Sequence, residues 1–124
     1  MNLSIVIVNW NTRDLLAQCL ASIVANPPDG EYEIIVVDNA STDGSVTMAR
    51  SAFPGVIVMQ NSENVGFGRA NNQAIRAARG DYALLLNSDT VVRPDTFEPL
   101  LAVMTTHPQA GAVGPTLLNP DGTF

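Results

Sequence analysis

Polar residues that could bind a cation follow directly on an apolar run in the stretch 81–95, DYALLLNSDTVVRPD. The run itself, Tyr82 to Leu86, is short and sharply bounded, which predicts a buried β-strand. Ligands of open α/β sheets bind at the carboxyl ends of the strands, and hard cations such as Mg2+ combine a few carboxylates with phosphate oxygens. We therefore expect Asp89 to bind a divalent cation that holds a diphosphate. The alternative is that Asn87-Ser88-Asp89 only turns the chain, since these residue types are common in turns.

Two further apolar runs end in polar residues of the same kinds. Asn9 and Asn11 follow the run LSIVIV, and Asp38 and Asn39 follow the run EIIVV. Both runs are rich in β-branched residues, as expected of central parallel strands that are covered on both faces. Because parallel strands end at one edge of their sheet, we expect the three polar sets to meet there.

Helical periodicity fills the segments between these strands. The alternation predicts an α/β fold with a mostly parallel sheet, helices on both faces and right-handed crossovers. No linker, repeat or low-complexity segment interrupts it, so we expect residues 1–124 to form a single domain. The predicted strands are 3–8, 33–37, 56–59, 82–86 and 110–114, and the predicted helices are 12–25, 45–52, 69–79 and 94–106.

Particular residues should set the ends of the helices. Asn11 can cap the first helix, Gly80 can end the third, and Pro94 suits the first turn of the fourth. The apolar stripe of the first helix includes Cys19, the single cysteine, which we interpret as a core residue.

The composition argues against several classes of protein. The 124 residues carry a formal net charge of −6, from 12 acidic and 6 basic side chains, which disfavours nonspecific nucleic-acid binding. There is no lysine and no glycine-rich turn after the first strand, so the chain has neither a phosphate loop nor a dinucleotide-binding fingerprint. The run 3–8 is too short to span a membrane and lacks the features of a signal peptide. A cytoplasmic location is therefore expected, and a peripheral position at the inner face of the membrane stays open.

Four motifs occur in order along the chain: SIVIVNWN, VVDNASTDGS, NVGFGRANNQAI and LLLNSDT. Together they closely resemble family 2 glycosyltransferases with the GT-A fold, and bacterial rhamnosyltransferase-like members most of all. The resemblance covers nearly the whole chain, from Leu3 to Phe124. It implies a Rossmann-like half-domain that binds a nucleoside diphosphate sugar.

The resemblance also assigns roles to matching positions. Val8 and Asn9 would line the base and the ribose, and Asp38 would accept a hydrogen bond from the ring N–H of the base. The ribose and the diphosphate would contact Asn64, Gly66 and Arg69. From the residues alone, other roles stay open. Asp38 could cap the next helix, Asn64 and Gly66 could be turn residues, and Arg69 could be a solvated helix residue.

Asn87-Ser88-Asp89 stands where the family has its D-x-D motif. The resemblance therefore implies that Asp89 holds Mg2+ or Mn2+ and that Ser88 and Asn87 contact the nucleotide sugar. Asn87 departs from the first aspartate of the motif, which leaves its contact with the ribose or the metal open.

The implied activity is that of an inverting, metal-dependent glycosyltransferase. It would transfer a sugar from a UDP- or dTDP-linked donor to a cell-surface polysaccharide or glycolipid, with a carboxylate base activating the acceptor hydroxyl. Two alternatives stay open: a nucleotide-sugar-binding module without turnover, and a nucleotidyltransferase. The latter would usually need a glycine-rich loop with Lys or Arg after the first strand, and this loop is absent.

The catalytic base has no candidate among the 12 carboxylates. Asp38 and Asp89 are assigned to the base of the nucleotide and to the metal, and the others fall on helices, before strands or in turns. We therefore expect the chain to be the N-terminal, donor-binding part of a longer enzyme, with its base beyond residue 124.

The last residues contain a strong hairpin signal, NPDG at 119–122, with only Thr123 and Phe124 after it. The return strand of that hairpin is missing. An unpaired strand that exposes Leu117, Leu118 and Phe124 should favour a homodimer through this edge.

Overall fold

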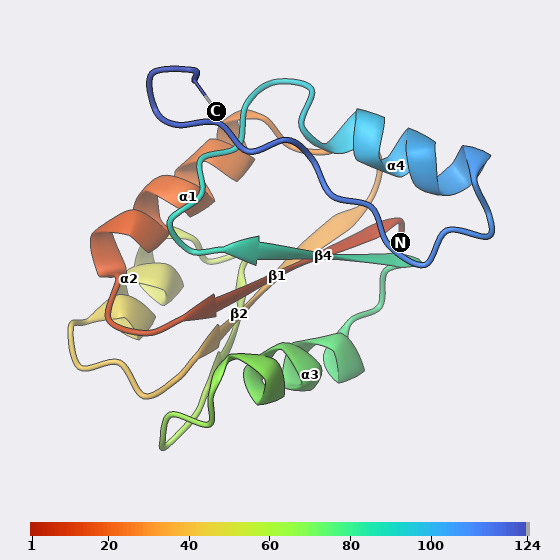
Figure 1. Cartoon of the computed structure of the whole chain (residues 1–124). Coiled ribbons are helices and arrows are strands. Elements are labelled where there is room, and N and C mark those ends of the chain that lie inside the picture. The colour runs from red at the N-terminus through yellow and green to blue at the C-terminus, as the bar shows by residue number, and fades with distance from the viewer. Residues whose placement is uncertain (124) are drawn as a thin grey trace.

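Strands and helices alternate along residues 1–123, the part of the chain that the computed structural model describes (Figure 1). The elements are β1 (Leu3–Asn9), α1 (Arg13–Ala25), β2 (Tyr32–Asp38), α2 (Ser45–Ala52), β3 (Ile57–Gln60), α3 (Phe67–Ala77), β4 (Tyr82–Asn87) and α4 (Phe97–Thr106). The four strands are all parallel and lie in the order β3-β2-β1-β4. The predicted α/β class and parallel sheet are therefore confirmed. None of the helices described is long and apolar enough to cross a membrane.

Alternate residues of β1 face two different apolar layers. Leu3, Ile5 and Ile7 pack in one core with buried residues of α1, α2 and α4. Val6 packs on the opposite face with residues of β2 and α3, and Figure 1 shows α3 alone on that side of the sheet. Ala70 and Ala74 are the fully buried residues of α3, and their small side chains let the helix lie close to the strands. Cys19 is fully buried in the first core, as predicted.

The prediction of a strand at Tyr82 to Leu86 is confirmed as β4, but the strand is not fully buried. The strand lies at one end of the sheet, and its exposure alternates along its length. Tyr82, Leu84 and Leu86 pack toward α1 and α4, whereas Leu85 on the other face is 50% exposed. The reason is that α3 packs mainly over β1 and β2.

The predicted fifth strand, 110–114, is not a strand in the structure. Within residues 1–123, this segment makes one backbone hydrogen bond. The Ala110 N–H donates to the His107 carbonyl, which forms a local turn. A strand needs a paired neighbour, and this segment has none. The sheet of the described residues therefore has four strands.

Two predicted helix starts are also wrong. Asn11 has a positive φ of 51°, and its Oδ1 accepts a hydrogen bond from the Thr42 N–H at 2.8 Å, so it does not cap α1. Pro94 precedes a turn, and Asp95 adopts a φ of 64°, which is incompatible with helix continuation. The helix α4 begins only at Phe97.

Gly80 does not end α3 as predicted, because the helix stops at Ala77 with Ala78 after it. Instead, Gly80 lets its backbone lie close to the backbone of Leu3 and Ser4 in β1. A Cβ at Gly80 would lie 2.6 Å from the Ser4 amide nitrogen and 2.7 Å from the Leu3 carbonyl carbon. Only glycine therefore lets the chain enter β4 beside β1 at this point.

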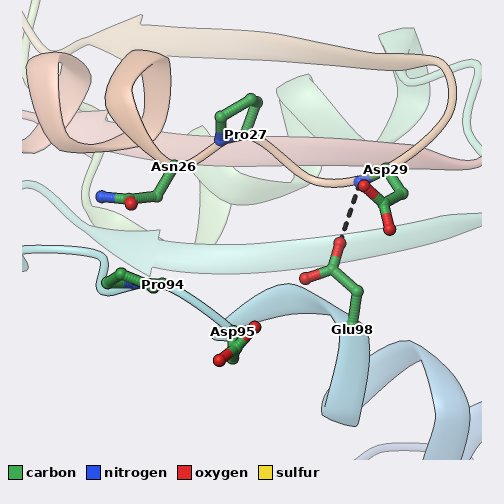
Figure 2. A pocket seen from close by; sticks show the side chains of 6 residues that line it. All are labelled: Asn26, Pro27, Asp29, Pro94, Asp95 and Glu98. Carbon is green, nitrogen blue, oxygen red and sulfur yellow. Dashed lines mark hydrogen bonds between the residues drawn. The ribbon is translucent and has the colours of Figure 1, made fainter.

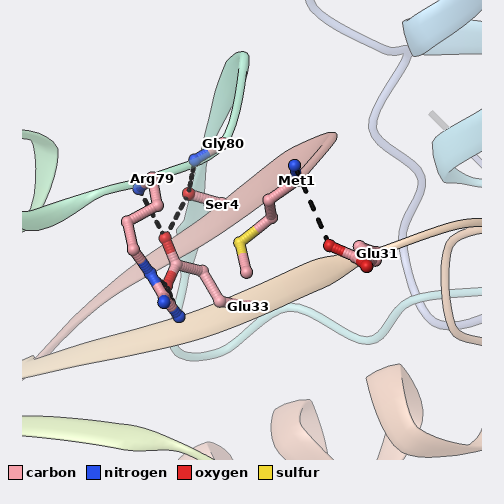
Figure 3. Close-up of polar contacts among 6 residues, drawn as sticks. All are labelled: Met1, Ser4, Glu31, Glu33, Arg79 and Gly80. Carbon is pink, nitrogen blue, oxygen red and sulfur yellow. Dashed lines mark hydrogen bonds and ion pairs between the residues drawn. The ribbon is translucent and has the colours of Figure 1, made fainter.

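A buried carboxylate joins three segments at the edge where the strands begin (Figure 3). Glu33 is 7% exposed, and its Oε1 accepts hydrogen bonds from the Ser4 hydroxyl at 2.6 Å and the Arg79 N–H at 2.7 Å. The Arg79 guanidinium lies 3.2 Å from Oε2, and the Ser4 hydroxyl accepts from the Gly80 N–H at 2.8 Å. This cluster ties β1 and β2 to the turn between α3 and β4.

Glu33→Gln is expected to cost about 2 kcal/mol of unfolding free energy at pH 7, the size of a charged hydrogen bond. Burial alone would raise the pKa of the Glu33 carboxyl, but the bonds from Ser4 and Arg79 hold it below the ordinary 4.5. A lowered pKa stabilises the fold above the ordinary pKa, and this stabilisation is lost as the pH falls through the folded pKa. Urea unfolding should therefore show a gap between wild type and variant that closes below about pH 4.

Glu31→Gln is the matched control for that experiment. Glu31 lies at the same edge, but its side chain is 81% exposed and its carboxylate is 3.9 Å from the amino group of Met1. Exposed pairs of this kind contribute little. Equal losses in the two variants would contradict the stabilising role of the buried cluster.

The hairpin signal near the end of the chain does form a turn. The Gly122 N–H donates to the Asn119 carbonyl at 2.9 Å, and Gly122 has a φ of 89°. Leu117 and Leu118 are 74% and 44% exposed, and Phe124 lies outside the described residues.

Self-association through this edge stays a prediction. We expect light scattering to give a mass that rises above 13.2 kDa with concentration, because the exposed side chains of Leu117 and Leu118 favour contact between copies. Leu117→Glu should return the mass to that of a monomer. A constant monomer mass for the unmodified chain would contradict the prediction.

Candidate functional site at the carboxyl ends of the strands

The parallel register brings the ends of three strands side by side. Asn9 of β1 pairs with Asp38 of β2, and Val8 pairs with Asn87 of β4. We call this edge of the sheet the carboxyl edge, and the opposite edge the amino edge. The sequence-based expectation that the three polar sets meet at one edge is therefore confirmed.

Asp38 is almost fully enclosed at the carboxyl edge, with 1% exposure, beside Asn9 with 0%. Its Oδ1 accepts from the Asn9 amide at 3.0 Å and from the Ser41 hydroxyl at 2.7 Å, and its Oδ2 accepts from the Ser41 N–H at 2.8 Å. A base N–H could use only the remaining acceptor position on Oδ2. The predicted contact with a nucleotide base thus requires access to one oxygen of a nearly buried carboxylate.

The sequence did not identify Ser41, although this residue is hydrogen-bonded both to Asp38 after β2 and to Asn11 after β1. Besides its bonds to Asp38, its hydroxyl accepts from the backbone N–H of Asn11 at 2.9 Å. The positive φ of Asn11 turns the chain so that this N–H points at Ser41. The capping residues in the segment 40–44 were a visible signal, but only the fold shows which of them reaches β1.

Asp43 caps the starts of two helices from one carboxylate. Its Oδ2 accepts from the Arg13 N–H at 2.9 Å, and its Oδ1 accepts from the Ser45 N–H at 3.0 Å. Burial would raise the pKa of the Asp43 carboxyl, but the bonds from Ser45 and Arg13 hold it below its ordinary value. An open depression of about 350 Å³ lies beside it, lined by Asn11, Thr12, Arg13, Asp14, Leu15 and Asp43.

A cluster of side-chain amides holds the loop before α3. Asn61 and Gln73 exchange two hydrogen bonds, of 2.8 and 3.0 Å, and Asn61 also donates to Asn39 Oδ1 at 3.1 Å. The Asn39 amide then donates to the Gly66 carbonyl at 3.2 Å. Sequence reasoning placed Asn39 at the strand end but did not find Asn61 or Gln73, because their pairing depends on how α3 packs.

Asn64, Gly66 and Arg69 lie on this loop and the first turns of α3. Asn64 Oδ1 accepts from the Gly66 N–H at 2.9 Å, and Gly66 has a φ of 89°, so both residues shape the turn. The exposed side chain of Arg69 makes no hydrogen bond or ion pair within residues 1–123. Its guanidinium is therefore available to an anionic ligand.

The turn after β4 carries Ser88 and Asp89. The Ser88 hydroxyl lies 3.1 Å from the Thr12 hydroxyl, which in turn donates to Asn9 Oδ1 at 2.7 Å. Asp89 is exposed and makes no hydrogen bond or ion pair within the part of the chain described. The Cys19 thiol lies beneath this turn. Its own burial, and to a smaller extent the charge of Asp89, raise the pKa of the thiol to about 12.

The donor set at Asp89 fits a cation that also binds phosphate. Within residues 1–123, no three His, Cys, Asp or Glu side chains lie close enough together to bind a metal ion by themselves. A free carboxylate at a strand end suits a hard ion that takes its other ligands from a diphosphate and water.

A second depression, of about 210 Å³, lies at the other end of α1 (Figure 2). It is lined by Asn26, Pro27, Asp29, Pro94, Asp95 and Glu98, and Glu98 accepts a hydrogen bond from the Asp29 N–H at 2.9 Å. Because α1 runs back from the carboxyl edge, this depression belongs to the amino edge. It contains none of the predicted site residues.

A parallel sheet whose polar residues converge at one carboxyl edge defines an α/β protein of the kind that binds ligands at its strand ends. The family described as glycosyl transferase family 2 matches residues 4–124. The chain therefore belongs to glycosyl transferase family 2, and the predicted resemblance is confirmed.

Two curated relatives show how much of a longer protein this chain represents. It is 38% identical over 97 residues to a poly(ribitol-phosphate) beta-glucosyltransferase of Bacillus spizizenii, covering 74% of the chain and 15% of that protein. It is 29% identical over 133 residues to an N-acetylglucosaminyl-diphospho-decaprenol L-rhamnosyltransferase of Mycobacterium tuberculosis, covering 98% of the chain and 43% of that protein. The chain thus spans less than half the length of either relative.

Solved structures agree on the fold. Residues 1–349 of S. aureus TarS in complex with UDP-GlcNAc match 94% of this chain and 37% of that one, with a TM-score of 0.76 and 24% identity. The mannosyltransferase PcManGT from Pyrobaculum calidifontis, in complex with GDP-Man and Mn2+, matches 97% of this chain and 36% of that one, with a TM-score of 0.74 and 23% identity.

Proposed function

We propose that the chain is the donor-binding part of an inverting glycosyltransferase that uses a nucleoside diphosphate sugar. The observation that carries the proposal is the convergence of Asn9, Asp38 and Ser88 at the carboxyl edge in a member of this family. The poly(ribitol-phosphate) glucosyltransferase and the decaprenol-linked rhamnosyltransferase among its relatives support a cell-surface polymer or glycolipid as acceptor.

The base and the ribose would lie against β1 and β2. Val8 is half-buried at the end of β1, and the one open acceptor position of Asp38 suits a single ring N–H. Asn9 holds the Asp38 carboxylate in place through the 3.0 Å hydrogen bond. A UDP- or dTDP-linked donor fits this arrangement, since uracil and thymine each carry one such N–H.

The diphosphate would lie between Arg69 and Asp89. Arg69 is exposed and unpaired within residues 1–123, so it can offer its guanidinium to phosphate oxygens. Asn87 and Ser88 precede Asp89 and can contact the ribose or the phosphates. When bound at Asp89, Mg2+ or Mn2+ would stabilise the charge of the leaving diphosphate.

A binding module without turnover is the second candidate. The observation that favours it is that, among the residues described, the carboxylates near the predicted metal site are paired, buried or hydrogen-bonded, and the free carboxylate of Glu63 lies at the far end of the sheet, after β3. Donor binding is common to both candidates, so it is the first property to test.

Binding of UDP should be at least about tenfold tighter with MnCl2 than with EDTA, because two phosphate charges need neutralising where one arginine is available. Asp89→Ala should remove this difference. Isothermal titration calorimetry with UDP, dTDP and GDP, each with and without metal, measures it directly.

Asp81→Ala is the matched control, since Asp81 is an exposed aspartate at the amino edge, on the other end of β4. It should keep the full metal dependence. Equal UDP affinity in MnCl2 and EDTA for the unmodified chain would contradict the role of Asp89, and no binding of any of the three nucleotides would contradict the proposed function.

A further inference from the structure

Thr12 stands at the N-cap of α1, yet its hydroxyl does not cap the helix. The Arg13 N–H at the start of the helix is bound by Asp43 Oδ2 at 2.9 Å. Threonine is favoured at this position because its oxygen usually accepts from the first helical N–H groups. The hydroxyl of Thr12 is therefore free to take part in something other than helix formation.

That hydroxyl connects two strand ends. It donates to Asn9 Oδ1 at 2.7 Å and lies 3.1 Å from the Ser88 hydroxyl. Because a hydroxyl has one proton, the Ser88 hydroxyl must be the donor in the second contact. The hydrogen bonds then run in one direction, from Ser88 to Thr12, to Asn9 and finally to the Asp38 carboxylate.

The turn after β4 is anchored at its two ends, by the pairing of Asn87 with Val8 and by the Val92 N–H, which donates to the Ser22 hydroxyl at 2.9 Å. Among residues 1–123, the contact between Ser88 and Thr12 is the one hydrogen bond between side chains that joins residues 87–91 to another segment. The Cys19 thiol also makes a weak contact with the Asn87 carbonyl at 3.8 Å. Asp89 makes no hydrogen bond of its own there, so its position relative to β1 depends on the anchoring of Ser88.

We propose that Thr12 is a positioning residue that couples the predicted metal site at Asp89 to the predicted nucleotide site at Asp38. This inference rests on the proposed function, since it needs both ligands to bind the same edge. A nucleotide that fixes the positions of Asn9 and Asp38 would also fix the position of Ser88, because hydrogen bonds connect the three residues through Thr12. Metal and nucleotide should then bind more tightly together than either does alone.

The experiment is a double-mutant cycle on the metal dependence of UDP binding. Calorimetry gives the ratio of UDP affinity in MnCl2 to that in EDTA for wild type, Thr12→Val, Ser88→Ala and the double variant. Each single variant should lower the ratio about fivefold, the usual weight of one hydrogen bond. The double variant should fall no further than the singles, because both remove the same contact.

Two controls separate positioning from a general loss of structure. Thr12→Ser keeps the hydroxyl and should keep the ratio. Ser88→Ala leaves the buried Asn9 oxygen with its Thr12 donor, so it folds even if Thr12→Val is destabilised. Without any ligand, hydrogen exchange at the amides of Ser88, Asp89 and Thr90 should be faster in Thr12→Val and unchanged in Thr12→Ser.

The possible outcomes are distinct. If Thr12→Val and Ser88→Ala keep the wild-type ratio, or if their effects on it add, Thr12 does not couple the sites and only this inference fails. If the unmodified chain binds UDP equally well with metal and with EDTA, or not at all, the proposed function fails and this inference with it.

Discussion

Replacing Asp38 with asparagine is expected to lower the unfolding free energy of the chain by about 3 kcal/mol. The carboxylate accepts three hydrogen bonds while 1% exposed, from Asn9 and from the hydroxyl and N–H of Ser41. An amide group would turn an NH2 toward at least one of these donors. A buried donor facing another donor loses its bond and keeps the full cost of desolvation.

Urea unfolding followed by circular dichroism measures this loss, and calorimetry with UDP measures binding at a temperature where the variant is folded. Asp14→Asn is the matched control, because Asp14 lies at the same edge with its side chain 84% exposed. It should change stability by less than about 0.5 kcal/mol. If Asp38→Asn unfolds like the wild type but no longer binds UDP, the carboxylate serves the ligand and its internal hydrogen bonds contribute little.

The sequence alone predicts the opposite order for Asp38, with binding weakened more than folding. The difference comes from Ser41, whose hydroxyl and N–H enclose the carboxylate. Sequence patterns locate a carboxylate at a strand end, but they do not show how many donors the following loop turns toward it. The same limit hides Thr12, because its partner Ser88 is 76 positions away along the chain.

The strands that could be predicted were those whose composition decides the outcome. The runs 3–8 and 33–37 are rich in β-branched residues, and β1 and β2 are covered on both faces as expected. The run 82–86 is also apolar, although it has no β-branched residue, but it lies at the end of the sheet and is exposed on one face. Apolar composition therefore predicts a strand without fixing its place in the sheet.

Glycine and asparagine were the least reliable signals. Gly80 suggests the end of a helix, whereas its missing Cβ makes room for the backbone of β1, 2.6 Å away from where that Cβ would lie. Asn11 suggests a helix cap, whereas its positive φ aims a backbone N–H at Ser41. In both cases the residue serves a contact between segments far apart in the sequence, which local patterns do not contain.

Residues 1–124 on their own are expected to bind a nucleoside diphosphate sugar without transferring the sugar. An inverting reaction needs a base within hydrogen-bond reach of the acceptor hydroxyl, on the side of the sugar away from the diphosphate. A free carboxylate with an ordinary pKa is the usual choice, so the carboxylates of the carboxyl edge decide the outcome.

None of these carboxylates meets that requirement. Asp14 is paired with the Arg13 guanidinium at 3.1 Å, and Asp38 is buried. Asp43 caps two helices, and the hydrogen bonds that offset its burial leave the pKa of its carboxyl below the ordinary value, which makes it a weak base. Glu63 follows β3, at the opposite end of the sheet from the predicted metal site after β4.

The assay is transfer from radiolabelled UDP- and dTDP-sugars to a lipid-linked or polymer acceptor, with a full-length family 2 enzyme as positive control. The rate with the 124-residue chain should be lower by at least about 10²-fold, the smaller end of what a positioned base contributes. Donor binding by calorimetry should be retained in the same preparation. Metal-dependent transfer by this chain, abolished by Asp43→Asn or Glu63→Gln, would show that the base lies within residues 1–124 and that the chain is catalytically complete.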